Sequence, residues 1–170
     1  MHSIYRISAR PFWNHWQVLT SFYGNMLMLG PLLVVLVYAT VQLYNGRPWS
    51  MTAAQLAAVM LAGMLIETIG LYFHAKDLRD GSGEGQASHF LQTTTFGNIY
   101  LARNAGLGLA ISMLLALYIT APAGVPGLLV WLAAAGVIGV TAVVGRALFY
   151  ALVIPTTMPG AFFWHNKGFE

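Results

Sequence analysis

Four long apolar segments dominate this chain and restrict it to a membrane-spanning fold. They cover residues 17–43, 52–74, 98–120 and 127–155. At a rise of about 1.5 Å per residue, a helix over each segment can cross the roughly 30 Å of hydrocarbon in a bilayer. The composition agrees, because 58% of the residues are hydrophobic and only 8% are charged, whereas soluble domains carry about 25%. The sequence predicts an all-α integral membrane protein, a four-helix transmembrane bundle that forms one domain over residues 1–170.

The connecting segments predict the orientation of the bundle. Four spans place both termini on the same side of the membrane, here called side A. The side-A segments hold five cationic residues: Arg6, Arg10, Lys76, Arg79 and Lys167. The two side-B turns hold one, Arg47. Since Lys and Arg accumulate in cytoplasmic loops, this excess predicts that side A is cytoplasmic.

Smaller features predict details of the bundle. The polar, glycine-rich residues 80–86 predict a flexible loop on side A, and residues 88–96 a short interfacial segment. Aromatic residues on side A predict a belt at the membrane interface: Phe12, Trp13, Trp16, Tyr72, Phe73, Phe163 and Trp164. Glycines within the spans predict close contacts between helices: Gly63, Gly70, Gly136, Gly139 and Gly145.

Three ionisable residues, Glu67, Arg103 and Arg146, lie within or at the margins of three different spans. A charge there costs at least about 2.5–3.5 kcal/mol, so such a residue usually has a partner or a function. Helical rise puts Glu67 about 10 Å and Arg103 about 8 Å inside the side-A boundary, with Arg146 close to it. Other polar residues reach comparable levels: Asn25, His74, Asn104 and Tyr150. The pattern predicts a polar site in the side-A leaflet.

Two interpretations of these residues stay open. Arg103 and Arg146 lie close enough to the boundary to serve as anchors, and either could form an ion pair with Glu67 that holds helices together. Alternatively, the residues line a site for a quinone head group or for proton transfer. Glu67 is hardest to explain as an anchor, because its short side chain cannot reach the interface from about 10 Å.

Several classes of site are excluded or disfavoured. The chain has no cysteine, so it supplies no disulfide, thiolate zinc site or iron–sulfur ligand. Its five histidines lie in tails and loops or, for His74, at the end of a span, which disfavours a bis-histidine haem. The sequence contains no metal-protease, phosphate-binding or catalytic-serine motif. The few cations are typical of topology signals rather than of a nucleic-acid surface.

Four segments of the chain, taken in order, follow the pattern of one known family. Residues 4–15 read Ile-Tyr-Arg-Ile-Ser-Ala-Arg-Pro-Phe-Trp-Asn-His, and the next span contains Leu-Gly-Pro-Leu at 29–32. This order resembles the middle of the membrane anchor subunits of DMSO-reductase-type complexes, where an Ile-Tyr segment, a Pro and a Trp precede a span. The third span, with Arg103 near its start, is similar to the family's seventh. Residues 145–150, Gly-Arg-Ala-Leu-Phe-Tyr, resemble its last helix, and residues 155–164 look closest to the sulfite dehydrogenase branch.

The resemblance covers almost the whole chain but matches only the C-terminal half of a usual eight-span anchor. The chain would then be a natural short form, one part of a split anchor or a truncated product. The family implies a respiratory complex in the bacterial inner membrane, with a molybdopterin catalytic subunit and a four-cluster iron–sulfur subunit. The anchor binds no cofactor of its own; it docks the iron–sulfur subunit and exchanges electrons with menaquinone or ubiquinone.

On this basis we expect the polar residues to serve quinone chemistry. Glu67 or His74 would help to move protons, and Arg103, Arg146 or Tyr150 would hydrogen-bond the head group. Partners docked on a cytoplasmic side A favour the sulfite dehydrogenase branch. Two other functions stay open. A structural or assembly subunit would need these residues for stability alone, and a small proton or ion transporter would need polar residues across both leaflets.

Overall fold

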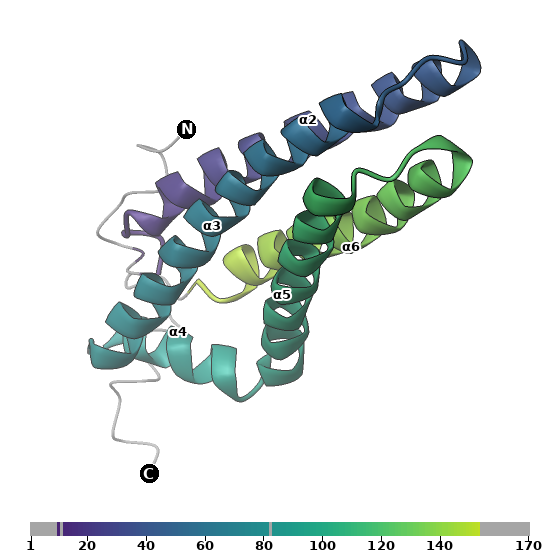
Figure 1. Cartoon of the computed structure of the whole chain (residues 1–170). Coiled ribbons are helices and arrows are strands. Elements are labelled where there is room, and N and C mark those ends of the chain that lie inside the picture. The colour runs from purple at the N-terminus through teal and green to yellow at the C-terminus, as the bar shows by residue number, and fades with distance from the viewer. Residues whose placement is uncertain (1–9, 11, 82, 154–170) are drawn as a thin grey trace, which may run out of the picture.

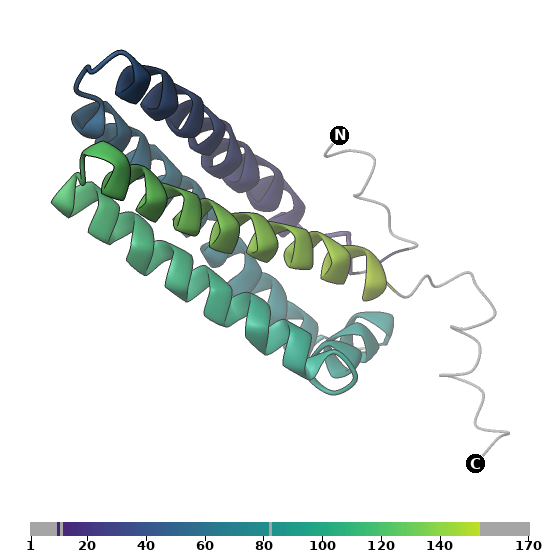
Figure 2. The same ribbon diagram turned by 90° about the vertical axis from the view of Figure 1, so that its right-hand side faces the viewer.

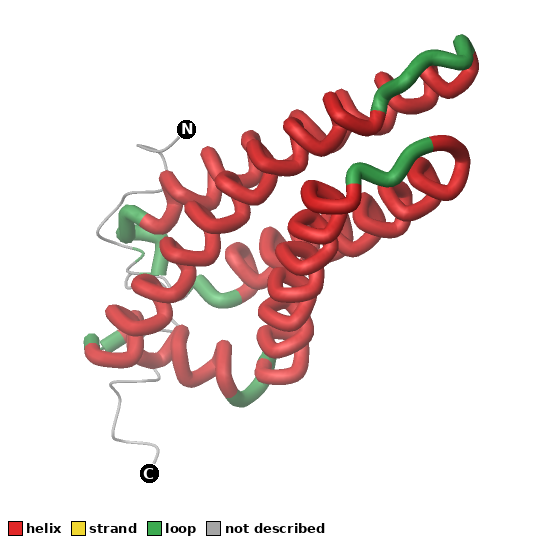
Figure 3. Tube along the Cα trace, in the orientation of Figure 1, coloured by secondary structure: helices red, strands yellow, loops and turns green. Residues whose placement is uncertain are grey.

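Four long helices dominate the computed structural model, which describes residues 10, 12–81 and 83–153 (Figure 1). They are α2 (Gln17–Tyr44), α3 (Ser50–Asp80), α5 (Gly97–Thr120) and α6 (Gly124–Ala151). A short helix, α4 (Glu84–Thr93), joins α3 to α5. The described residues contain no strand (Figure 3). All four long helices are long and apolar enough to cross a membrane, so the predicted all-helical four-span bundle is confirmed.

The bundle consists of two antiparallel helix hairpins, α2–α3 and α5–α6, that lie side by side (Figure 2). The two short turns lie together at one end, side B, whereas α4 and the segment before α2 lie at the other, side A (Figure 1). Apolar side chains fill the side-B half, where Trp131, Met60 and Leu114 belong to one buried cluster. A smaller buried cluster joins the segment before α2 to the end of α6 on side A.

Helix boundaries agree with the predicted spans to within a few residues, except at the side-A end of α3. This helix continues to Asp80, and its 31 residues are about 46 Å long. Because that exceeds the hydrocarbon thickness, its last turns extend into the interfacial region or beyond it. The predicted flexibility of residues 84–86 is wrong, since α4 begins at Glu84. The helix α6 ends at Ala151, and residues 154–155, which the prediction included, lie outside the described residues.

Glycines bring α2 and α3 close together, as predicted for Gly63 and Gly70. A Cβ on Gly63 would lie 2.8 Å from the Gly24 carbonyl oxygen, and a Cβ on Gly70 would overlap the Thr20 side chain. Small residues at such positions let helix backbones approach in a membrane. The same prediction is wrong for three glycines of α6, where an added Cβ would meet nothing within 4 Å: Gly136, Gly139 and Gly145.

The start of the segment before α2 packs against the side-A end of α6 and does not lie at the membrane interface. Phe12 and Trp13 are buried, at 4% and 7% exposure, so their predicted place in the aromatic belt is wrong. The Trp13 indole N–H donates a hydrogen bond of 2.9 Å to the Phe149 carbonyl, and the two rings stack at 5.4 Å. The belt residues of α3 and the start of α2 are exposed as expected: Trp16, Tyr72 and Phe73. Phe163 and Trp164 lie outside the described residues.

Candidate functional site

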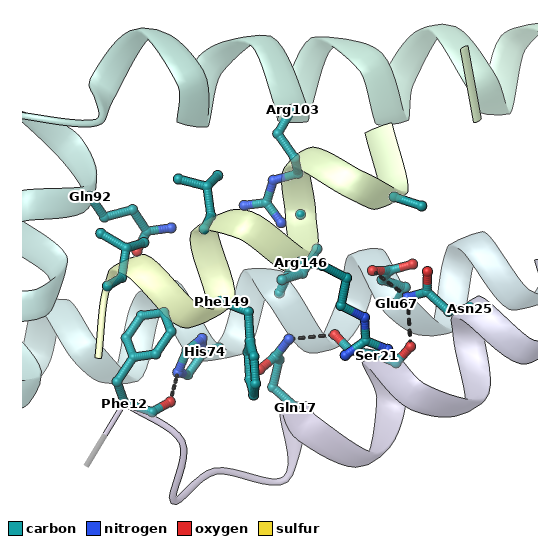
Figure 4. A pocket seen from close by; sticks show the side chains of 15 residues that line it. Phe12, Gln17, Ser21, Asn25, Glu67, His74, Gln92, Arg103, Arg146 and Phe149 are labelled. Carbon is teal, nitrogen blue, oxygen red and sulfur yellow. Dashed lines mark hydrogen bonds between the residues drawn. The ribbon is translucent and has the colours of Figure 1, made fainter. Parts of the chain in front are cut away.

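A buried polar cavity of about 40 Å³ lies in the side-A half, where all five described helices contribute side chains (Figure 4). It is lined by Phe12, Gln17, Ser21, Asn25, Glu67, Leu71, His74, Gln92, Arg103, Ala142, Gly145, Arg146, Leu148, Phe149 and Leu152. Four residues predicted for a polar site are therefore brought together from three helices: Glu67, His74, Arg103 and Arg146.

Tyr150 is not part of this cavity. Its side chain is 51% exposed, and its ring makes edge contacts with Trp13 at 5.9 Å and Phe149 at 5.3 Å. Phe149, one residue earlier, is buried and lines the cavity instead. On a helix, consecutive residues point about 100° apart, and this rotation turns Tyr150 away from the cavity that Phe149 lines.

Glu67 is held by α2 rather than by an arginine. Its carboxylate accepts a hydrogen bond of 3.1 Å from the Asn25 side-chain amide, which also donates to the Ser21 carbonyl at 2.7 Å. Gly24 makes this contact possible, because a Cβ there would lie 2.8 Å from the Glu67 Cβ. Close approach of the two backbones thus places a short amide within reach of a buried carboxyl group.

The two arginines pack against aromatic rings. The Arg103 guanidinium carbon lies 5.1 Å from the Tyr100 ring centroid, and that of Arg146 lies 4.4 Å from the Phe22 ring centroid. Such cation–π contacts attract a guanidinium group to a ring face without a carboxylate partner. Both arginines line the same cavity as Glu67. Among the described residues, however, neither forms a salt bridge with it, so the direct ion pair considered as a structural alternative is not present there.

Hydrogen bonds fix the ring of His74, which lines the cavity, and the ring of its neighbour His15. His74 is 4% exposed, and its Nε2 lies 2.8 Å from the Phe12 carbonyl oxygen. A carbonyl only accepts, so Nε2 carries the proton and Nδ1 is the acceptor of the neutral ring. The His15 ring lies 5.0 Å away and is fixed in the same way, because its Nδ1 accepts from the Gln17 backbone N–H and its Nε2 donates to Asp77.

Sequence reasoning missed part of the polar lining. Gln17 and Ser21 are 2% and 7% exposed, and the Gln17 amide donates to the Ser21 hydroxyl. With Asn25 they recur every four residues on α2, a spacing that puts them on one helix face. This four-residue spacing of polar side chains at the start of an apolar span is a sequence signal that predicts a polar face on α2. Gln92, which closes the cavity from α4 at 6% exposure, carries no comparable signal.

The size of the cavity limits what it can do. A cavity needs about 10–15 Å³ to hold one water molecule, whereas pockets for small organic molecules have volumes of about 300–1,000 Å³. The cavity therefore has room for a few water molecules beside a carboxyl group, an imidazole and two guanidinium groups. Such a site can hold and transfer protons. No group of three or more potential metal-ligating side chains occurs among the described residues.

Comparison with known proteins gives one family. The sequence profile of the DMSO reductase anchor subunit (DmsC) family matches residues 1–152. Comparisons with curated proteins and with solved structures gave no significant match. The matched region contains all four membrane-length helices and the whole polar cavity. This multi-pass membrane protein therefore belongs to the DMSO reductase anchor subunit family.

Proposed function

We propose that this chain anchors a molybdopterin oxidoreductase to the bacterial inner membrane and exchanges electrons with menaquinone or ubiquinone. A four-cluster iron–sulfur subunit docks on side A, and the molybdopterin catalytic subunit binds to that subunit. The observation that carries the proposal is the family match over the whole described bundle. The polar cavity adds support, because it gathers ionisable side chains toward side A, where we propose that the partners dock.

The orientation in this proposal follows the distribution of positive charge. The side-A end of α3 extends past the hydrocarbon and exposes Lys76 and Arg79. Cationic segments of this kind stay in the cytoplasm, so the partner subunits are cytoplasmic as well. That arrangement favours the sulfite dehydrogenase branch of the family, in which electrons pass from the substrate into quinone.

Purification of the tagged full-length chain from its native membranes tests the anchor function. The protein is extracted in a mild detergent. The co-purified proteins are identified by mass spectrometry, and bound iron and molybdenum are assayed. We expect a molybdopterin subunit and an iron–sulfur protein. A second four-span chain in the same preparation would identify this chain as half of a split anchor. A protein that is recovered alone and metal-free, while other respiratory complexes stay intact, contradicts the proposal.

The Glu67→Gln variant tests the quinone part. Glutamine keeps the shape and the hydrogen bond with Asn25 but cannot release or take up a proton. In the assembled complex we expect slower electron transfer to quinone, while electron transfer from the catalytic subunit to a soluble dye is unchanged. A wild-type quinone-linked rate would remove Glu67 from the mechanism.

A structural or assembly subunit without a redox site is the second candidate. The small volume of the polar cavity favours it, because about 40 Å³ cannot accept a quinone ring. In that case Glu67→Gln lowers the yield of assembled complex, and the complexes that do form transfer electrons to quinone at the normal rate.

A further inference from the structure

The charges that line the polar cavity do not balance. Two guanidinium groups, those of Arg103 and Arg146, line it together with one carboxyl group, that of Glu67. An arginine side chain stays protonated in proteins. The remaining ionisable group of the lining, His74, donates through Nε2 to the Phe12 carbonyl and supplies no negative charge. Even with Glu67 ionised, the cavity therefore carries at least one positive charge in excess.

The other acidic residues of the described region do not supply the missing negative charge. Asp77 and Asp80 lie at the exposed side-A end of α3, where Asp77 pairs with His15 and Asp80 with Arg79. Glu84 begins α4. None of these three acids lines the cavity. Among the described residues, the excess positive charge of the cavity is therefore without a counter-charge.

Aromatic rings hold the two arginines but do not neutralise them. The faces of Tyr100 and Phe22 attract a cation through the quadrupole of the ring, which carries no net charge. Neither guanidinium group forms a hydrogen bond or a salt bridge with another described residue. Arg103 is only 6% exposed, and Figure 4 shows its side chain reaching from α5 into the cavity. A buried charge in a membrane protein is costly unless it is paired.

We propose that the polar cavity binds one small monovalent anion, of the size of chloride. The volume of about 40 Å³ holds a few water molecules, and a chloride ion is only slightly larger than one of them. The N–H groups of Arg103 and Arg146 donate to the ion, and its charge offsets the excess. Because Glu67 already supplies one negative charge, a single monovalent ion completes the balance. This inference does not depend on the proposed exchange of electrons with quinone.

Thermal unfolding of the wild-type chain tests the site without any substitution. The full-length protein in lipid nanodiscs is equilibrated with sodium chloride, sodium bromide or sodium gluconate at the same concentration and pH. Gluconate is a sugar acid far larger than the cavity and should not enter it. We expect Tm in chloride or bromide to exceed Tm in gluconate by at least about 3 °C, because a ligand that binds only the folded state stabilises it.

Charge variants separate the cavity from a general effect of salt. Chloride replaces gluconate stepwise at constant ionic strength, and the dependence of Tm on chloride gives Kd. For Arg103→Gln and for Arg146→Gln we expect Kd to rise at least about tenfold, since each removes a positive charge beside the ion. Arg79→Gln is the matched control, because Arg79 is an exposed cation on side A that does not line the cavity. Its Kd should stay within about twofold of wild type.

Glu67→Gln gives a change in the opposite direction. It keeps the hydrogen bond with Asn25 and cannot carry a negative charge, so it should bind chloride at least as tightly as wild type. The two arginine variants give independent readings, so failure of one to fold leaves the other. Equal Tm in chloride and gluconate, weaker binding by Glu67→Gln, or an equal loss in Arg79→Gln and the cavity variants overturns the anion site.

Discussion

The helix α3 has two faces that pack in opposite ways. Toward α2, Gly63 and Gly70 let the backbones approach so closely that a Cβ at either position would overlap its neighbours. Toward α5, the same helix borders a groove of about 320 Å³. Lipid is as apolar as the bundle interior, so helices in a membrane associate through close packing and hydrogen bonds. The α2 face therefore stabilises the bundle, and the α5 face is the one with room for a ligand.

The largest effect should come from disrupting the close-packed face. In Gly63→Leu, the added side chain would overlap the Gly24 carbonyl oxygen at 2.8 Å, and this backbone atom cannot move aside easily. We expect a loss of about 3 kcal/mol in the free energy of unfolding, the upper range for overpacking. Unfolding by a denaturing detergent, followed by circular dichroism, measures it.

Gly30→Leu is the control for this variant. Gly30 also lies in the α2–α3 hairpin but has no atom within 4 Å of an added Cβ. Its substitution should change the free energy of unfolding by less than about 0.5 kcal/mol. Equal stability of the two variants would show that the hairpin does not depend on the glycine contacts.

A smaller effect is expected from the polar contact on the same face. Asn25→Ala removes the hydrogen bond from α2 to the Glu67 carboxylate. Hydrogen bonds between membrane helices contribute about 0.6 kcal/mol on average and at most about 1.7, so the free energy of unfolding should fall within that range. Thr40→Ala is the control, since the Thr40 hydroxyl donates only to the Leu36 carbonyl of its own helix among the described residues. A loss no greater than in this control would show that the Asn25–Glu67 contact is not stabilising.

On the open face, substitution should cost almost nothing. Gly108 lines the groove between α3 and α5, and a Cβ added there would meet no atom within 4 Å. We expect the free energy of unfolding of Gly108→Leu to stay within about 0.5 kcal/mol of wild type, as for exposed positions away from packed features. The same unfolding measurement applies. A loss as large as that of Gly63→Leu would mean that α3 and α5 pack together closely in the membrane and that the groove does not persist.

Most of this architecture could be predicted from the sequence, because length and apolarity decide whether a helix can span a membrane. The positions of Glu67, Arg103 and Arg146 along their spans also predicted that they would lie at one level, and they line one cavity. Periodicity within a span carries less information, since every face of a membrane helix is apolar. The glycines show this limit: Gly63 meets α2 whereas Gly136 meets nothing, although both lie in similar apolar surroundings.

The parts that could not be predicted depend on tertiary contacts. Phe12 and Trp13 are residue types that are typical of an interfacial belt. Trp13 is buried, however, and its indole N–H donates to the Phe149 carbonyl, 136 residues away in the sequence. The direct ion pair between Glu67 and an arginine, one of the two interpretations that the sequence leaves open, is absent among the described residues for a similar reason. Tyr100 and Phe22 offer ring faces to Arg103 and Arg146, and Asn25 is the group that reaches the carboxylate.

The smallest expected effect concerns α4, the short helix that joins the side-A ends of α3 and α5. Partial burial and the nearby positive charge of Arg79 lower the pKa of His89 in this helix. An unfolded α4 segment takes up a proton at a pKa of about 6.5, so below that pH protonation favours the unfolded segment over the folded one. Hydrogen exchange in α4, corrected for the intrinsic rate, should therefore accelerate modestly between pH 7.5 and about 5.5, whereas that of α2 should not. His89→Gln should remove the pH dependence, and if α4 in that variant still loosens at low pH, another group on side A is responsible.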